Sequence, residues 1–514
     1  MKKILGIELG STRIKSVLID EEASVIAQGS FEWENVLTDG LWSYSLEDVE
    51  RGIQSSYSAL AVDYYEKIGE PLNEISAIGI SAMMHGYLAF DKNDSLLVPF
   101  RTWRNTNTEK AAKELTELLE FNIPMRWSVS HYYQAVLDGE AHVNDVSFLT
   151  TLAGYVHYKL TGKKVLGIGD ASGMFPIKDG KYNEVMLEKI NALLSKNGVD
   201  TPFEMLLPEI LFAGEKAGTL TEDGARWLDP TGVLNAGAVL CAPEGDAGTG
   251  MVATNSITPR TANVSAGTSA FLMAVLERDL SAYYEEIDVV TTPVGAPVAM
   301  VHVNNFASEI TSWTNLFEEV ISLSGNNVDR GVLFDSLYRK SLEADGDVGG
   351  FIGYNFLAGE PIAKVSSGIP MIARTPDGAF TLANFMKMQI YSALGTLAIG
   401  CEMLERENVA IDSVFGHGGF FKTPYVGQSA MSAAVKAPVT VMKNAGEGGA
   451  WGIALLALFA YSEENDLDVF LERIFKDSEK TTVMANDAEK ASFADFMEKY
   501  KKGLAFERLA LEVL

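Results

Sequence analysis

The chain has 514 residues, 47% hydrophobic and 21% charged, and 41 Lys and Arg against 69 Asp and Glu give a net charge of −28. These values are typical of a globular protein with two large or three ordinary domains, and they exclude a disordered chain or a disulfide-stapled mini-protein. Because so acidic a surface repels phosphate backbones and anionic lipid, we expect no nucleic acid and no membrane as partner, although backbone amides can still bind a small phosphorylated ligand.

The cysteines and the first residues bear on the compartment. The chain has only two cysteines, Cys241 and Cys401, which excludes a cysteine-rich zinc site or an iron–sulfur cluster built from this chain alone and favours a reducing compartment. Glu8 interrupts the first apolar stretch too early for a signal peptide, and no apolar run is long enough to cross a bilayer. We therefore expect a cytoplasmic protein.

The first half of the chain opens with a predicted β-hairpin. We predict strands at Ile4–Leu9, Ile14–Ile19, Val25–Gly29, Ile75–Ile80 and Ala238–Ala242, and helices at Glu109–Leu119 and Phe148–Leu160. The turn of the first hairpin is Gly10-Ser11-Thr12, a small tip that exposes backbone amides.

The second half restarts in the same style. We predict strands at Arg260–Ser265, Ala270–Val275, Ile411–Phe415 and Val439–Met442, and helices at Leu382–Glu405, at Pro424–Ala434 and from Glu447 through Ala460. Strands that alternate with helices indicate an α/β protein. The restart places a boundary near residue 250, with domains at 1–248 and 249–514, and predicts two α/β domains around a deep cleft, each with a mixed five-stranded sheet.

The two hairpin turns share a pattern. Gly10-Ser11-Thr12 and Gly267-Thr268-Ser269 each place two hydroxyl residues after a glycine, half a chain apart. Either turn alone is an ordinary hairpin connection. Their duplication favours a second interpretation, in which backbone amides and hydroxyls from two similar halves hold one phosphate group.

Three further segments are candidates for substrate contacts. Asp246 follows a predicted buried strand inside the glycine-rich run 243–250, which suits a general base, although such an aspartate can also simply cap its own turn. His85 ends a predicted strand and is either a ligand contact or a buried histidine bonded to backbone. Trp103 and Asn105 combine an aromatic face with a polar tip, which suits a sugar but also ordinary surface packing.

Two glycine-rich segments in the second half allow close approach to the backbone. Gly416-His417-Gly418-Gly419 and Glu447-Gly448-Gly449-Ala450 flank one strand–helix–strand unit. Both fit close packing of elements, and together they favour a flat pocket such as one for adenine. No Walker A, dinucleotide-binding, H-E-x-x-H or G-x-S-x-G pattern occurs.

Taken in order, these segments resemble the FGGY family of carbohydrate kinases. The matching motifs are Gly6–Thr12, Met84-His85-Gly86, Tyr158–Gly162, Asp170–Gly173, Gly245-Asp246, Ser265–Ser269, Gly418-Gly419 and Gly448–Ala457. The resemblance covers nearly the whole chain. It implies two actin-like (ribonuclease H-like) ATPase domains around a deep cleft, with the sugar and the catalytic aspartate in the first domain and the nucleotide in the second.

The resemblance also implies a role for each candidate residue in phosphoryl transfer from ATP to a sugar hydroxyl. Asp246 is the implied general base, and Glu8 the implied Mg²⁺ ligand. Met84, His85, Trp103 and Asn105 are the implied sugar contacts, and Ser11, Thr12, Lys15, Gly267, Thr268, Ser269, Gly418 and Gly419 the implied nucleotide contacts. The partner is then a small-molecule sugar; a homodimer stays open.

Three positions depart from the pattern of xylulose kinases in this family. Glu8 replaces the usual Asp, Ala247 replaces the usual Asn, and Trp103-Arg104-Asn105 replaces Trp-Asn-Asp. A ketopentose such as xylulose is the first expectation, with ribulose, a deoxy-ketose or gluconate left open. Two rivals also stay open: a non-catalytic actin-like sensor of sugar or nucleotide, and an actin-like ATPase that acts on a protein.

Overall fold

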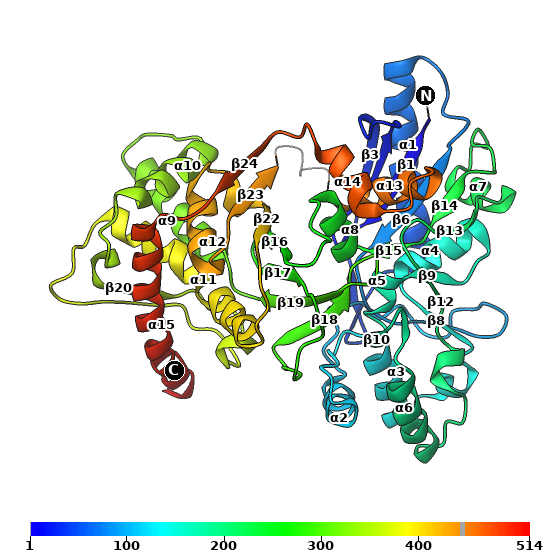
Figure 1. The fold of residues 1–514 in the computed structure, drawn as a ribbon, viewed down its shortest axis with the longest axis horizontal. Helices are drawn as coiled ribbons and strands as arrows, with labels where there is room; N and C mark the ends of the chain where they lie inside the picture. The colour runs from blue at the N-terminus through cyan, green and yellow to red at the C-terminus, as the bar shows by residue number, and fades with distance from the viewer. Residues whose placement is uncertain (1, 443–447, 514) are drawn as a thin grey trace.

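The computed structural model describes residues 2–442 and 448–513, which form two α/β lobes side by side (Figure 1). The sheet of the N-terminal lobe contains β1 (Ile4–Leu9), β2 (Arg13–Ile19), β3 (Val25–Glu32), β6 (Ala77–Ala82), β13 (Lys216–Thr219), β14 (Val239–Cys241) and β15 (Glu244–Gly245). The sheet of the C-terminal lobe contains β16 (Thr261–Ala266), β17 (Ala270–Val275), β18 (Ile287–Thr291), β19 (Pro297–Val303), β22 (Ser413–His417), β23 (Val439–Met442) and β24 (Lys480–Val483).

The helices and short ribbons surround these sheets. The helices are α1 (Leu46–Ile68), α2 (Glu109–Leu119), α3 (Ser128–Leu137), α4 (Leu152–Thr161), α5 (Ile168–Ala171), α6 (Glu184–Lys196), α7 (Glu222–Leu228), α8 (Asp246–Ala253), α9 (Ser308–Leu323), α10 (Arg330–Lys340), α11 (Leu382–Arg406), α12 (Val426–Val435), α13 (Gly448–Tyr461), α14 (Leu467–Phe475) and α15 (Asp487–Val513). Two-stranded ribbons pair β4 (Val36–Thr38) with β5 (Leu41–Ser43), β7 (Leu88–Phe90) with β8 (Phe148–Thr150), β9 (Val165–Gly167) with β12 (Glu209–Leu211), β10 (Ile177–Lys178) with β11 (Lys181–Tyr182), and β20 (Phe351–Tyr354) with β21 (Met371–Arg374).

The two large sheets repeat one topology. The order β3-β2-β1-β6-β14 in the first matches β19-β17-β16-β22-β23 in the second, with two antiparallel pairs followed by two parallel pairs in each. The predicted duplication is therefore present in the fold. The prediction of five strands per sheet is wrong, because β13 and β15 extend the first sheet and β18 and β24 the second, giving seven strands in each.

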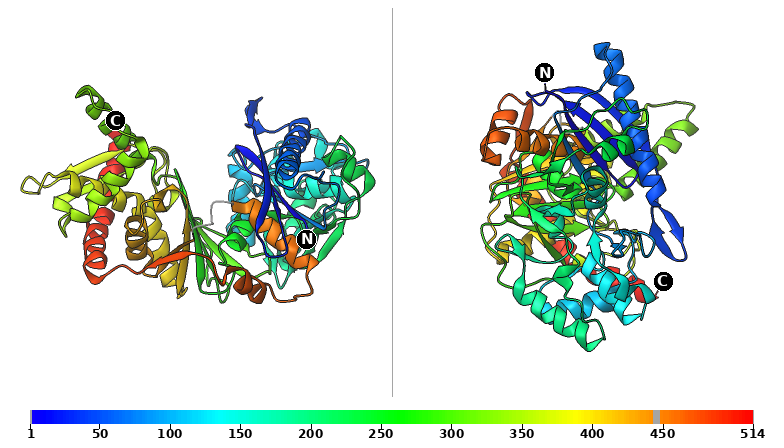
Figure 2. Two further views of the ribbon diagram at one scale, coloured as in Figure 1. Left: turned by 90° about the horizontal axis from the view of Figure 1, so that it is seen from above. Right: turned by 90° about the vertical axis from the view of Figure 1, so that its right-hand side faces the viewer.

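Helix α13 belongs to the N-terminal lobe although it comes late in the chain. Its sequence carries no charged residue, and its side chains are buried almost throughout, as in a helix enclosed on every side. It packs on β1, β6 and α8. Figures 1 and 2 show α13 beside β1, while the C-terminal helix α15 lies in the other lobe. The predicted boundary at 248/249 falls inside α8.

The predicted elements agree with the structure where local signals are strong. Strand β1, strand β17, strand β23 and helix α2 have the predicted bounds. The predicted helix at Phe148–Leu160 is wrong over its first residues. Phe148–Thr150 pairs with β7 instead, and Thr151 then caps α4 by accepting a hydrogen bond from the Gly154 N–H. In the described part of the chain, no helix combines the length and apolar character needed to span a membrane.

Candidate active site

Asp246 is the first residue of α8, directly after the short strand β15. The backbone N–H of Met84 donates to its Oδ1 at 3.2 Å. The pKa of Asp246 is raised to about 6. Burial is the main cause and the charge of Glu8 adds to it, while the N–H groups of Met84 and Ala247 act in the opposite direction. The predicted strand at Ala238–Ala242 corresponds to β14, and Asp246 follows a second short strand, β15, that was not predicted.

Glu8 lies near the end of β1, in the middle of the first sheet. Burial raises its pKa, and the opposing influences are the charge of Lys15, which faces it on β2, and N–H groups of Ala450 and Gly449 at the start of α13. A Cβ on Gly449 would lie 2.5 Å from Glu8 Oε1, so the helix can approach this carboxylate only with glycine there. Glu447, which the sequence analysis grouped with these residues, lies outside the described residues.

The first hydroxyl turn connects β1 and β2 as predicted, and aromatic residues hold its backbone. The indole of Trp33 donates to the Gly10 carbonyl at 2.7 Å, and the Tyr44 hydroxyl donates to the Ser11 carbonyl at 2.6 Å. The two aromatic rings stack at 4.2 Å. A surface depression beside the turn is lined by Thr12, Arg13, Glu32, Trp33 and Glu34.

The second hydroxyl turn connects β16 and β17. The Gly267 N–H donates to the Ser269 carbonyl at 2.9 Å, and Gly267 and Thr268 are exposed. Nearby, a Cβ on Gly418 would lie 2.3 Å from the Ala266 carbonyl oxygen, and Gly418 has φ +105°, so this position requires glycine for close packing. Gly419 has open space around it.

His85 is buried and adopts φ +69°, an uncommon conformation for a residue with a side chain. Its Nδ1 lies 3.3 Å from the Gly173 carbonyl, which can only accept, so Nδ1 carries the hydrogen. Burial lowers the pKa of His85 well below its usual value, and the Arg126 guanidinium acts in the same direction. The imidazole is therefore neutral at pH 7, with Nε2 as an acceptor.

Met84 and Asn105 have mainly positioning contacts. A Cβ on Gly245 would lie 2.2 Å from Met84 Cγ, so the Met84 side chain fills the space beside that glycine. The Asn105 side-chain amide accepts a hydrogen bond from the Trp42 N–H at 2.8 Å and donates one to the Trp42 carbonyl at 2.9 Å. These two bonds fix the Asn105 side chain to strand β5. Trp103 is 39% exposed.

Ten of the fourteen candidate residues form two groups. Glu8, Lys15, Met84, His85 and Asp246 gather around the ends of β1 and β6 and the start of α8. The other group, Gly267, Thr268, Ser269, Gly418 and Gly419, lies where β16 and β22 end. Among residues 2–442 and 448–513, no hydrogen bond joins the two groups.

The sequence analysis missed two buried carboxyl groups near Asp246. Asp170 accepts from the Thr151 hydroxyl at 2.6 Å, and Glu244 accepts from the N–H groups of Gly169 and Asp170 at 3.1 and 2.9 Å. Burial raises the pKa of Asp170 to about 7 and that of Glu244 to about 8. The sequence signal that could have identified Asp170 is its position between Gly169 and Ala171. The sequence analysis named Asp170 only as part of the motif Asp170–Gly173.

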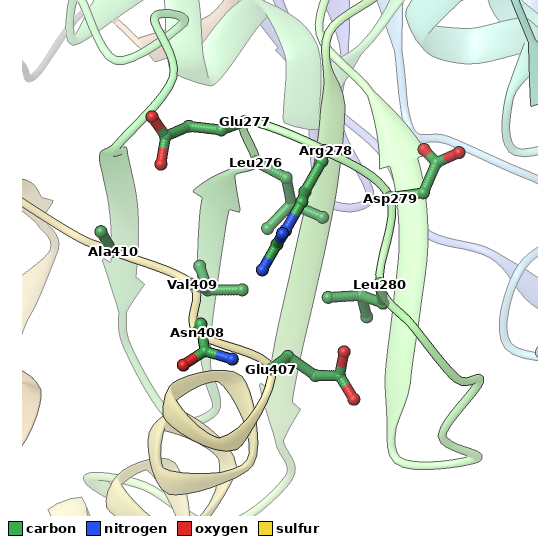
Figure 3. A pocket seen from close by; sticks show the side chains of 9 residues that line it. All are labelled: Leu276, Glu277, Arg278, Asp279, Leu280, Glu407, Asn408, Val409 and Ala410. Atoms are coloured by element: carbon green, nitrogen blue, oxygen red, sulfur yellow. The ribbon is translucent and has the colours of Figure 1, made fainter.

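A separate pocket lies in the C-terminal lobe, away from every candidate residue. It is lined by residues 276–280 and 407–410, and the side chains of Arg278 and Glu407 are drawn in Figure 3. Glu407 is already committed there, since it accepts from Ser281 and from the Tyr284 hydroxyl. In the described part of the chain, no three or more His, Cys, Asp or Glu side chains are grouped to hold a metal ion.

Comparison with known proteins matches both halves of the chain. The model of the FGGY family of carbohydrate kinases, N-terminal domain, matches residues 3–238, and that of the C-terminal domain matches residues 262–461. The xylulose kinase of Haemophilus influenzae is 22% identical over 513 residues, which cover 96% of this chain and 98% of that protein.

Two solved structures from Lactobacillus acidophilus have the same fold. Its ligand-bound xylulose kinase superposes with a TM-score of 0.80 at 16% identity, covering 100% of this chain and 99% of that one. Its gluconate kinase superposes with a TM-score of 0.79 at 16% identity, covering 100% and 98%. With both family models matched along most of its length, this chain belongs to the FGGY family of carbohydrate kinases.

Proposed function

We propose that this enzyme transfers the γ-phosphoryl group of ATP to a hydroxyl of a ketopentose such as xylulose, with Asp246 as general base. The observation that carries the proposal is the setting of Asp246. Its carboxylate is partly buried and accepts a hydrogen bond from the N–H of Met84, the residue just before His85. A pKa of about 6 leaves it ionised at neutral pH and still basic enough to accept a hydroxyl proton.

The sugar lies against the end of β6 in this proposal. His85 offers Nε2 as an acceptor for a sugar hydroxyl because Nδ1 is bonded to the Gly173 carbonyl. Met84 supplies an apolar surface, and Trp103 an exposed ring face of the kind that stacks on sugars. Asn105 acts indirectly, by holding the loop at Trp42.

The nucleotide lies between the two hydroxyl turns. Backbone amides and hydroxyls of Ser11 and Thr12 on one side, and of Gly267, Thr268 and Ser269 on the other, bracket the phosphates, and Lys15 adds a positive charge. Gly418 and Gly419 receive the adenosine. Since the two groups are not hydrogen-bonded to each other, closure of the lobes brings them together and excludes water from the transfer.

Glu8 is the proposed ligand of Mg²⁺, held directly or through water. A partly buried carboxylate fits this hard cation, which keeps several waters and uses few protein ligands. When bound, Mg²⁺ neutralises charge on the phosphates. Lys15 lies opposite Glu8 on the neighbouring strand, and its charge lowers the pKa of that carboxyl.

A substrate screen tests the proposal. ADP release is measured with ATP and a panel of ketopentoses, polyols and aldonates, for wild type, Asp246→Asn and Asp223→Asn, the last a control whose side chain is 93% exposed on α7. We expect the highest kcat/KM with a ketopentose, and kcat lower by about 10²–10⁴ in Asp246→Asn alone.

Other outcomes of the same screen are decisive. A folded Asp246→Asn enzyme with more than about a tenth of wild-type kcat removes Asp246 as the base. Highest activity with gluconate replaces the ketopentose as substrate, and highest activity with ribulose keeps the ketopentose class but replaces xylulose within it. Binding of sugar and nucleotide without any ADP release supports a non-catalytic sensor.

A further inference from the structure

The backbone and ring of His85 are held by residues 126–128, just before and at the start of α3. The Gly86 N–H donates to the Arg126 carbonyl at 3.1 Å, and the Ser128 hydroxyl donates to the Gly86 carbonyl at 2.6 Å. The Trp127 ring lies parallel to the imidazole at 6.3 Å between centroids. These contacts hold His85 in its strained backbone conformation.

A second segment, at the end of α5, holds the imidazole from another side. His85 Nδ1 donates to the Gly173 carbonyl at 3.3 Å. A Cβ on Gly173 would lie 2.6 Å from that Nδ1, so the segment approaches the ring as closely as a backbone can. The orientation of His85 therefore depends on residues 126–128 and on residues 172–173.

Both segments are bonded to the same strand of the other lobe, β18. The Arg126 guanidinium forms an ion pair with Asp288, and the Asn122 amide donates to Asp288 Oδ1 at 2.9 Å and to the Ile287 carbonyl at 3.1 Å. The Thr291 N–H donates to the Ser172 hydroxyl at 3.0 Å. The ion pair is largely shielded, with Arg126 24% and Asp288 12% exposed.

We propose that β18 couples the position of the C-terminal lobe to the sugar site, with Arg126 and Asp288 as positioning residues that act through His85. This inference rests on the proposed function, since it takes His85 as a sugar contact. Movement of the C-terminal lobe shifts β18, and β18 moves both segments that orient the imidazole. Sugar and nucleotide then strengthen each other's binding by the same factor, as linkage requires.

Charges around the pair fit this role. His302 on β19 faces Arg126 and Asp288. Burial and the charge of Arg126 lower the pKa of His302, while the charge of Asp288 raises it, and the net shift is downward, so the imidazole is neutral. The Asp288 carboxylate thus neutralises the charge of the Arg126 guanidinium, whose other neighbours include the neutral imidazoles of His85 and His302. Breaking such a pair leaves a partly buried charge without a partner.

The test compares four proteins: wild type, Asp288→Asn, Arg126→Gln and the double variant. The matched control is Lys178→Gln, because Lys178 also pairs across the lobes, with Asp279 at 3.4 Å, but both side chains are more than half exposed. Calorimetry gives the dissociation constant of the best sugar from the screen, with and without a non-hydrolysable ATP analogue. Hydrogen exchange is followed at residues 85–86 and 126–128.

We expect the analogue to tighten sugar binding to wild type and to Lys178→Gln by at least about fivefold, the lower end of typical coupling between sites. Asp288→Asn and Arg126→Gln each lose most of this factor, the double variant loses no more than either single one, and exchange at the two segments becomes faster. Asp288 does not touch the proposed sugar site, so its effect must pass through the residues that it contacts, Arg126 and Asn122.

Unchanged coupling and unchanged exchange in Asp288→Asn overturn the inference, as does an equal loss in Lys178→Gln. If wild type binds no sugar in the panel, the proposed function fails first, and the exchange measurement alone then decides whether β18 holds these segments. A variant that melts well below wild type is replaced by Asp288→Glu, which keeps the charge and should restore the coupling.

Discussion

Asp246 owes its chemistry to neighbours that are also carboxyl groups. Glu8, Asp170 and Glu244 are all buried near it, and burial raises the pKa of each. Burial raises the pKa of Asp246 to about 6, against the N–H groups of Met84 and Ala247, which favour its charged form. At pH 7 the carboxyl that touches the proposed sugar site is therefore ionised, which is the state a base needs.

The pH dependence of turnover follows from this shift. A base with a pKa of about 6 is protonated below that pH, so kcat/KM should rise with pH through about 6 and level off above it. Rates measured from pH 5 to 8 in one constant-ionic-strength buffer series check this. An acid limb centred near the ordinary Asp value of 3.8 would contradict the assignment. Residual turnover of Asp246→Asn should lack this limb.

At the scale of elements, α13 and the first sheet depend on glycines for their close contact. A Cβ on Gly6 would lie 2.0 Å from the Ala450 carbonyl oxygen, and one on Gly79 would lie 2.4 Å from that of Ile453. Because both obstacles are backbone atoms, no side-chain rotation relieves them. The same approach brings the N-terminus of α13, with its partial positive charge, to Glu8.

Gly6→Ala should therefore be strongly destabilising. Overpacking typically costs about 1–3 kcal/mol, and in a domain of this size each kcal/mol lowers Tm by about 2–4 °C, so we expect a loss of about 2–12 °C. Gly250→Ala is the matched control, because a Cβ there meets nothing within 4 Å. Since alanine favours a helix, its Tm should stay level or rise. Equal melting of both variants would show that α13 packs less closely than described.

At the scale of the whole molecule, the two lobes are not two consecutive stretches of chain. Helices α8, α13 and α14 lie in one lobe, while strands β16, β23 and β24 lie in the other (Figure 1). Strand β24 then pairs with β23 to complete the second sheet. The lobes are therefore joined by several connections, which suits closure about a hinge.

This arrangement predicts the behaviour of fragments. A fragment of residues 1–253 lacks α13 and α14, so the apolar face of β1 and β6 is left uncovered, and we expect aggregation or a broad, non-cooperative melting curve. The same fragment joined by a Gly/Ser linker to residues 448–476 should melt cooperatively. Circular dichroism of both fragments decides this. A cooperative transition in the shorter fragment would show that α13 is dispensable.

Local features and their order along the chain could be predicted from the residues alone. Alternating apolar residues and small turns were enough to predict the two hairpins, and a carboxylate after a short apolar run was enough to predict the place of Asp246. The duplication of the hydroxyl turns was enough to predict the repeated topology. These features depend on neighbours in the chain, so local composition encodes them.

Features that depend on partners far away in the chain could not be predicted before the fold was known. The strand at Phe148–Thr150 forms because β7 lies beside it. The Asn105 side chain is hydrogen-bonded to Trp42, and α13 packs on the sheet of the first lobe although it comes late in the chain. The pairing of Arg126 with Asp288 joins residues 162 positions apart. Such contacts carry no local period or motif, because they are selected by burial and charge after the lobes have formed, and a single sequence does not reveal which residues will meet.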